Sequence, residues 1–317
     1  MMKKLIVLLS LFVAITISGC LMQGPEVTGG PGVVITDFSV DYSPITAGDS
    51  VGWNIEVQNQ GEYDTSIFLV TWFGVDPSAW GFTATDTTSH AVVGADPVTG
   101  FEGGTWFTTQ TLTSPSSIAS ATTFDLGVRI EYIYETAYTA TIRIVDPDYL
   151  RTLSKEDRDA LISSGGIRQS TATAAPITIK AASGAHFVAR GGTGTPVTIP
   201  FRVTNVGSGL PYNEDATNAE DAVADGLYEI MIKSGSTSGI SCDTSTPIVL
   251  SRGKNGGFGC SLTVPGTVNN FEDRTFSLTL RYKYYVDGST TLTVNAPYGG
   301  TTVATTVATT TVATTTV

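Results

Sequence analysis

Two stretches of the chain decide its fold, residues 124–134 with the sequence FDLGVRIEYIY and residues 276–286 with the sequence FSLTLRYKYYV. In each, aliphatic or aromatic residues occupy every second position, which is the period of a β-strand with one buried face. Arg129 and Arg281 occupy the same place on the two polar faces. The sequence therefore predicts two copies of one β module.

A second pair of matched strands lies upstream of these stretches. Residues 51–57 and 197–203 alternate in the same way, and both runs stop at an Asn-x-Gly triplet, at 59–61 and at 205–207. Two matches in the same order and at similar separations predict a tandem repeat. Each copy has about a hundred residues or slightly more, the size of an immunoglobulin-like sandwich.

The composition favours the same all-β class. The chain has 34 glycines among 317 residues, with many threonines and few runs of helix-forming residues. Its length favours two domains, which we place at 33–147 and 176–296. In each copy the alternating stretch is expected to turn into a hairpin, through residues 135–137 or through residues 287–288.

An alternating strand that ends in Asn-x-Gly resembles the immunoglobulin-like modules of archaeal and bacterial surface proteins, including the cell-adhesion-related CARDB type. The resemblance covers both copies. It implies two tandem immunoglobulin-like β-sandwich domains and, for function, adhesion at the cell surface.

A short helical connector is expected between the copies, within residues 148–175. Ser154 can cap the start of a helix, and the acidic residues that follow it suit the positive end of the helix dipole. The helix should run to about Ile162 and stop at the Gly165-Gly166 pair.

The N-terminus has the features of an export signal over residues 1–19. Lys3 and Lys4 form a basic start, and residues 5–17 are an almost unbroken apolar run. This run fits the core of a signal peptide better than a membrane span, which needs roughly 20 apolar residues.

The apolar run ends in Ile17-Ser18-Gly19-Cys20, which resembles the lipobox of bacterial and archaeal lipoproteins. The resemblance implies that Cys20 becomes the new N-terminus and carries the acyl chains that hold the body at the outer face of the cell membrane. Residues 20–32 would then be a flexible tether. An ordinary cleaved signal peptide and an uncleaved N-terminal helix are the alternatives, and both place the body outside the cell.

The two other cysteines, Cys242 and Cys260, predict a disulfide in an oxidising exterior. By closing a short loop, this bond would contribute roughly 3 kcal/mol to stability. The spacing is too short for the inter-sheet bridge of antibody domains, and two cysteines without convergent histidines do not favour a zinc site.

The formal net charge of −12 argues against nucleic acid as a partner. An acidic body is also repelled by anionic lipid headgroups, so that only a covalent or inserted anchor would hold it at a membrane. We therefore expect membrane contact through the lipid anchor, with envelope proteins or glycans as further partners.

No catalytic motif is recognisable. His90 and His186 lie near neither a nucleophile motif nor a metal-ligand spacing, so we expect a non-enzymatic protein without a cofactor or a metal. The acidic loop at 213–225 offers oxygen atoms to calcium but lacks the EF-hand spacing, and a solvated loop is the favoured interpretation.

Residues 74–123 form a long excursion in the first copy and carry the one candidate binding surface. Its aromatic residues can stack on sugars or anchor a protein partner; they are Trp80, Phe82, Phe101 and Trp106. The alternative is that the segment carries extra strands whose aromatic residues belong to the core.

Together these features predict a non-enzymatic cell-surface lipoprotein with a structural, adhesion or binding role in the envelope. The alternatives are an accessory solute- or glycan-binding protein of an envelope complex and an envelope hydrolase. The missing α/β alternation speaks against the solute-binding protein and the missing site chemistry against the hydrolase. Residues 297–317 are a threonine-rich low-complexity tail, dense in hydroxyls for O-glycosylation, which either projects freely or marks the sequence as a fragment.

Overall fold

The computed structural model describes most of the body of the chain. The described residues are 30–163, 166–182, 187–188, 196–223, 226–236, 240–263 and 268–297. The predicted signal peptide, Cys20 with the tether up to residue 29, and the tail from residue 298 onward lie outside the described residues.

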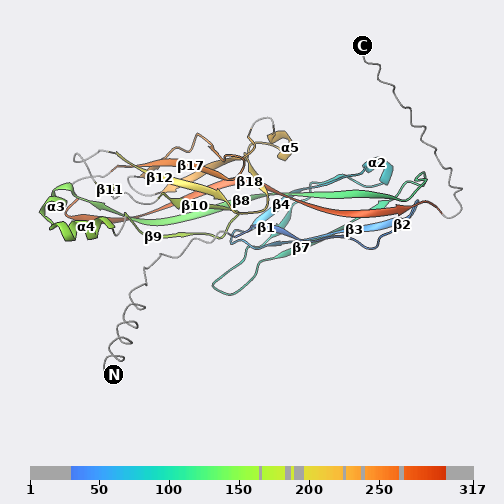
Figure 1. Cartoon of the computed structure of the whole chain (residues 1–317), viewed down its shortest axis with the longest axis horizontal. Helices are drawn as coiled ribbons and strands as arrows, with labels where there is room; N and C mark the ends of the chain where they lie inside the picture. Colours follow the sequence, from blue (N-terminus) through green and yellow to red (C-terminus); the bar gives the residue numbers. More distant parts are fainter. Residues whose placement is uncertain are drawn as a thin grey trace, which may run out of the picture.

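Two very long strands, β8 (Thr122–Val145) and β18 (Phe271–Asn295), run along an elongated molecule (Figure 1). They pair in antiparallel fashion along almost their whole length, from Thr122 opposite Val294 to Val145 opposite Phe271. The hairpins predicted at 135–137 and 287–288 are therefore wrong. Both strands continue straight on, because the backbone groups at these positions find their hydrogen-bond partners in the other long strand.

The remaining strands belong to two copies of one plan, and each copy ends in a long strand. The first copy, before β8, contains β1 (Val33–Val40), β2 (Ile45–Thr46), β3 (Ser50–Asn59), β4 (Thr65–Phe73), α2 (Pro77–Trp80), β5 (Thr85–Asp86), β6 (His90–Val92) and β7 (Thr105–Thr113). The second copy, before β18, contains β9 (Ile167–Ala172), β10 (Ile177–Ala181), β11 (Phe187–Val188), β12 (Pro196–Asn205), β13 (Leu210–Tyr212), α5 (Ala219–Ala222), β14 (Glu229–Ser236), β15 (Ile240–Cys242), β16 (Ile248–Val249) and β17 (Asn255–Thr263).

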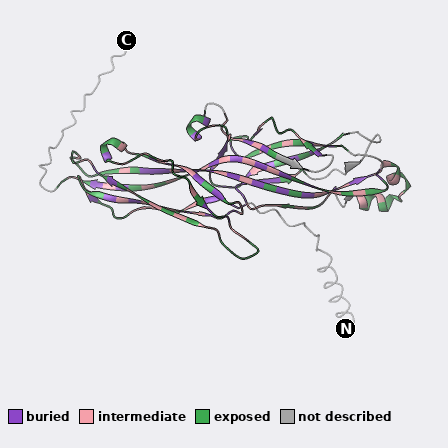
Figure 2. Cartoon of the chain, turned by 180° about the vertical axis from the view of Figure 1, so that it is seen from behind, coloured by how far each residue is buried: buried purple, intermediate pink, exposed green. Residues whose placement is uncertain are grey.

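The central sheet has the order β16-β14-β18-β8-β4-β5, and two smaller sheets cover one of its faces. The sheet β1-β3-β7 packs on one end, where the Tyr132 hydroxyl donates to the carbonyl of Val33 at 3.3 Å. The sheet β10-β12-β17-β15 packs on the other end, where the Thr136 hydroxyl donates to the carbonyl of Ile177 at 2.9 Å. Most buried hydrophobic residues form one cluster along the two long strands, and buried positions are coloured purple in Figure 2. A small second cluster contains Tyr212, Ala219 and Ala222.

The two sandwiches are not separate along the chain, which corrects the domains predicted at 33–147 and 176–296. The second half of β8 lies in the sandwich of the second copy, where Ile144 pairs with Phe187 of β11. The second half of β18 lies in the sandwich of the first copy, where Val294 pairs with Ile45 of β2. Each copy therefore completes its sandwich with the last strand of the other copy.

Both Asn-x-Gly triplets form the same buried corner. The Asn59 side chain donates to the carbonyls of Tyr63 and Val92 and accepts from the backbone N–H of Gly61. In the second copy, the Asn205 side chain donates to the carbonyls of Gly209 and Gly253 and accepts from the N–H of Gly207. The tyrosines of the long strands reach these corners too, because the hydroxyl of Tyr134 donates to Asn59 and that of Tyr284 to Asn205.

The helices of the connector predicted at 148–175 lie at the far tip of the molecule, beyond the end of β8, and not between two sandwiches (Figure 1). They are α3 (Pro147–Thr152) and α4 (Lys155–Ser163). Residues 167–172 of that range form β9, which pairs with β8. As predicted, Ser154 caps α4, because its hydroxyl oxygen accepts from the N–H of Asp157 at 3.1 Å. Among the described residues, no helix is long and apolar enough to span a membrane.

Candidate functional site

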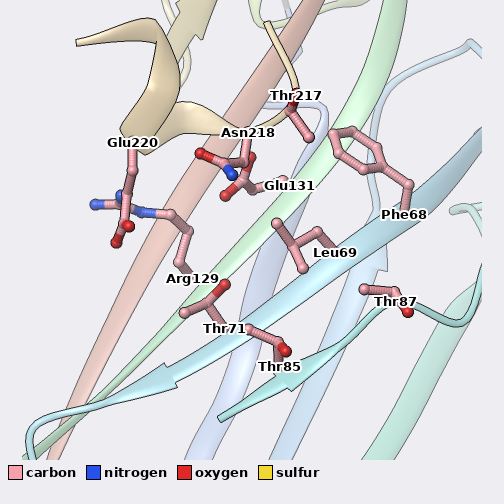
Figure 3. Close-up of a pocket in the computed structure, with 10 residues that line it drawn as sticks. All are labelled: Phe68, Leu69, Thr71, Thr85, Thr87, Arg129, Glu131, Thr217, Asn218 and Glu220. Carbon is pink, nitrogen blue, oxygen red and sulfur yellow. The ribbon is translucent and has the colours of Figure 1, made fainter.

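A cleft of about 340 Å³ lies where the two copies meet, on the face of the central sheet that carries Arg129 and Glu131 (Figure 3). Strand β8 forms its floor, β4 and β5 form one wall, and the segment that leads into α5 forms the other. We call it the junction cleft. Its lining residues are Phe68, Leu69, Thr71, Thr85, Thr87, Arg129, Glu131, Thr217, Asn218 and Glu220.

The most buried polar group of the junction cleft is the carboxylate of Glu131, a residue that is 1% exposed. Its Oε2 accepts hydrogen bonds from the Tyr212 hydroxyl at 2.5 Å and from the Ala219 backbone N–H at 2.9 Å. Burial raises the pKa of Glu131, because the loss of water outweighs these two donors and the nearby Arg129. Burial and the neighbouring Glu131 also raise the pKa of Tyr212. This pair ties β8 of the first copy to β13 of the second.

The cations near the cleft are already partnered within the protein. The Arg129 guanidinium donates to both carboxylate oxygens of Asp287, at 2.8 and 2.9 Å, and this hydrogen bonding raises the pKa of Arg129. It also lies 4.3 Å from the ring centroid of Tyr285. Lys283 Nζ donates to the carbonyl of Ala216 at 2.5 Å, and burial lowers the pKa of Lys283. Arg129 thus ties β8 to β18, and Lys283 ties β18 to the wall segment that leads into α5.

The acidic loop considered for calcium forms a wall of the junction cleft. Glu214 makes an ion pair with Arg281 at 2.8 Å, and the Asn213 amide donates to Glu229 at 2.9 Å. Asn218 caps α5 by accepting from the N–H of Asp221. Within the part of the chain that the structure describes, no three His, Cys, Asp or Glu residues are placed to hold a metal ion. Asp225 of this loop lies outside that part.

The junction cleft offers free hydroxyl groups beside an aromatic ring. Four threonines line it, and within the described residues their hydroxyls make no hydrogen bond to the protein; they are Thr71, Thr85, Thr87 and Thr217. Phe68 stands at one side and the carboxylate of Glu220 at the other (Figure 3). Apolar walls with a few convergent polar groups are the usual lining of a small-molecule site, and aromatic rings stack on the apolar faces of sugars. The cleft therefore suits a hydroxyl-rich ligand.

Two of the four aromatic residues of the predicted binding surface pack on the core, Trp80 as a buried and Phe82 as a half-buried residue. Trp80 is 3% exposed and packs edge-on against Phe124, with 5.0 Å between the ring centroids. Phe82 packs edge-on against the buried Trp53 at 5.8 Å. This corrects their assignment to a surface. The segment 74–123 carries β5, β6 and β7 in addition to α2. The alternative holds in that these two aromatic residues pack on the core, but Trp80 lies in α2 and Phe82 just after it, and neither lies in an extra strand.

The other two residues of that predicted surface lie at separate places. Phe101 is 47% exposed beside a turn closed by the backbone of Asp96. Trp106 is half-buried and stacks on His90, with 4.3 Å between the ring centroids. Both lie outside the junction cleft.

The predicted disulfide between Cys242 and Cys260 is present. It joins neighbouring strands of one sheet, β15 and β17, where the two cysteines lie opposite each other. The short spacing in the sequence thus fits a bond within a sheet, as expected.

Comparison with known proteins shows no family for this chain. No family model matches it, and no curated protein matches it in sequence. It is similar to the solved structure of red sea bream transglutaminase, at 11% identity over 82% of this chain and 31% of that chain, with a TM-score of 0.17. Two other similar structures are Escherichia coli alpha-2-macroglobulin activated by porcine elastase (8% identity, 83% of this chain and 33% of that chain, TM-score 0.13) and the collagen adhesin CNA from S. aureus (8%, 86% and 95%, 0.12). Such low TM-scores carry no argument about fold or function.

Proposed function

We propose that this chain is a non-enzymatic lipoprotein of the cell surface, with a structural or adhesive role as a stiff spacer in the envelope. The observation that carries the proposal is the pair β8 and β18, which continues through both sandwiches without a linker. Bending the molecule at its middle would break paired backbone hydrogen bonds and open a continuous core. Such a body would hold its two ends at a fixed separation.

The position of the body at the membrane rests on Cys20. Export and lipidation at this residue would leave a chain whose net charge is strongly negative, since the whole sequence carries −12 and the export segment is basic. Two acyl chains are sufficient for stable anchoring of a body that anionic headgroups repel. The proposed location is therefore the extracellular face of the cell membrane.

Mass spectrometry of the mature N-terminus from a membrane fraction tests this placement. We expect the first residue to be Cys20 with a diacylglyceryl group on its sulfur. The Cys20→Ser variant should move from the membrane fraction to the medium, while Cys242→Ser, which removes a sulfur of the disulfide and leaves Cys20 intact, should stay with the membrane. An unmodified Cys20 in a chain released to the medium would refute the proposal.

A second candidate function, glycan binding, is favoured by the junction cleft. Its four unpartnered threonine hydroxyls and the Phe68 ring suit a saccharide. Glycan-array binding by the full chain tests it. We expect Thr87→Val, which removes one hydroxyl from the cleft, to weaken binding several-fold, and Thr111→Val on the exposed face of β7 to leave binding unchanged. Equal binding by both variants would exclude the cleft as the glycan site.

A further inference from the structure

The two copies differ at one edge of their smaller sheets. In the second copy, β15 pairs with β17 along that edge, and the Cys242–Cys260 disulfide fixes it there. In the first copy, β7 occupies the place of β17 and pairs with β3 on one side only. No described strand pairs with its other side. Among the described strands, the first copy thus has no counterpart of β15.

The free edge of β7 lacks the features by which proteins usually protect edge strands. Its nine residues, TWFTTQTLT, contain no charged residue and no proline. The strand also pairs with β3 without a bulge, and Phe107 is 61% exposed. Long, uncharged and regular edges of this kind pair with a further strand.

A candidate for that further strand is the chain beyond β18, which leaves the body near the C-terminal end of β7. Strand β18 ends at Asn295, whose carbonyl accepts from the N–H of Ala47. Gly48, which follows Ala47, donates its N–H to the carbonyl of Ser114, the residue after the end of β7. The chain beyond β18 therefore starts near the C-terminal end of β7, with residues 47–49, which lead into β3, between the two. A segment that folded back from this point would run antiparallel to β7.

The composition of residues 301–317, TTVATTVATTTVATTTV, suits this place. The segment consists only of threonine, valine and alanine, and the first two are good strand formers. Its 17 residues are more than enough to span the nine of β7. We propose that residues 301–317 add as an antiparallel strand to the free edge of β7, in the place that β15 takes in the second copy.

Charge and tethering favour this segment over a second copy of the chain as the occupant. Two whole chains, each with a net charge of −12, repel each other, whereas residues 301–317 carry no charge. A short tether also holds the segment near β7 at an effective concentration on the order of millimolar. The added strand would give β7 the hydrogen bonds that its outer backbone groups lack in the sheet.

Hydrogen exchange of the full chain, compared with a variant that ends after Gly300, tests the proposal. We expect amides of residues 107–113 to exchange at least about tenfold faster in the shortened chain. Residues 260–262 serve as an internal control, because β15 pairs with them in both chains. The full-length double variant Val307→Pro and Val312→Pro should match the shortened chain, since proline cannot supply the strand hydrogen bonds.

The results separate the possible occupants of the edge. Equal exchange of residues 107–113 in all three chains would overturn the proposal. Protection that persists after shortening and grows with protein concentration would overturn it in favour of a second copy. Protection that returns when a peptide of residues 301–317 is added to the shortened chain would support it.

Discussion

The two copies share a backbone plan but fill their cores differently. The order β1-β3-β7 in the first copy repeats as β10-β12-β17 in the second, with an Asn-x-Gly corner in each. The first copy contains all four tryptophans of the chain, and the Trp53 and Trp72 rings lie 4.7 Å apart in its core. The second copy contains no tryptophan and has the disulfide instead.

The difference shows which features the fold requires and which it tolerates. The corners and the long strands recur in both copies, because they satisfy buried backbone groups that any version of this plan contains. The side chains that fill the core differ between the two copies. In the second copy, Phe201 stacks on Phe258 at 5.0 Å and meets Phe276 edge-on at 5.6 Å, in place of the tryptophans.

The largest effect is expected from emptying the tryptophan core of the first copy. Trp53→Ala should lower the free energy of unfolding by about 3–5 kcal/mol, because the side chain is fully buried. Trp53→Phe should cost less, since the indole N–H is buried without a hydrogen-bond partner. Urea unfolding followed by tryptophan fluorescence and by circular dichroism measures both variants.

The same titrations test whether the copies are coupled. Since β8 and β18 belong to both sandwiches, fluorescence and circular dichroism should report one shared transition even in Trp53→Ala. Two separate transitions, with the second copy persisting after the first has unfolded, would contradict the shared core.

The next largest effect is expected from the disulfide of the second copy. The cysteines are 18 residues apart, so that replacing both with alanine should lower the free energy of unfolding by about 3 kcal/mol. The parent chain unfolded in the presence of a reductant should show the same loss, which controls for the alanine side chains. A loss below about 1 kcal/mol would mean that the second copy relies on its packing as much as the first does.

The matched corners give a smaller and symmetrical prediction. Asn59→Ala and Asn205→Ala should each cost about 1–3 kcal/mol, because each leaves two buried or part-buried carbonyls without their side-chain donor. Chemical denaturation of the two variants side by side measures the costs. A large loss of unfolding free energy at one corner and none at the other would show that only one copy depends on its Asn-x-Gly triplet for stability.

The sequence predicted the features that depend on neighbouring residues. Alternation identified the buried faces of β8 and β18, and it identified β3 and β12 with their Asn-x-Gly ends. Ser154 identified the start of α4, and Cys242 and Cys260 identified the disulfide. The alternation and the helix cap lie within a few residues of the structure that they predict. The disulfide follows from the pair of cysteines and requires no knowledge of the strand order.

The sequence did not predict that each long strand continues into the sandwich of the other copy, and it did not predict the junction cleft. A strand that turns back and one that continues have the same alternation, and Asp287-Gly288 reads as a turn in either case. In the structure Gly288 lies within β18, and the side chains of Ile35 and Val128 lie close to where a Cβ at this position would stand. Pairing with the long strand of the other copy determines that β18 continues and does not turn back. The Glu131–Tyr212 contact joins residues 81 positions apart for the same reason.

The smallest expected effect concerns Glu131, at the contact between the copies, and is a dependence of the unfolding free energy on pH. Because burial raises the pKa of Glu131 above its ordinary value of 4.5, the folded chain holds a proton there that the unfolded chain has released. Stability should therefore fall as pH rises from about 4.5 through the raised pKa.

Glu131→Gln should flatten this slope, since glutamine does not titrate. Tyr212→Phe should steepen it, since it removes a donor that favours the carboxylate. Unfolding free energies from pH 4 to pH 8 measure all three chains, and identical slopes would show that Glu131 does not couple the copies through its charge.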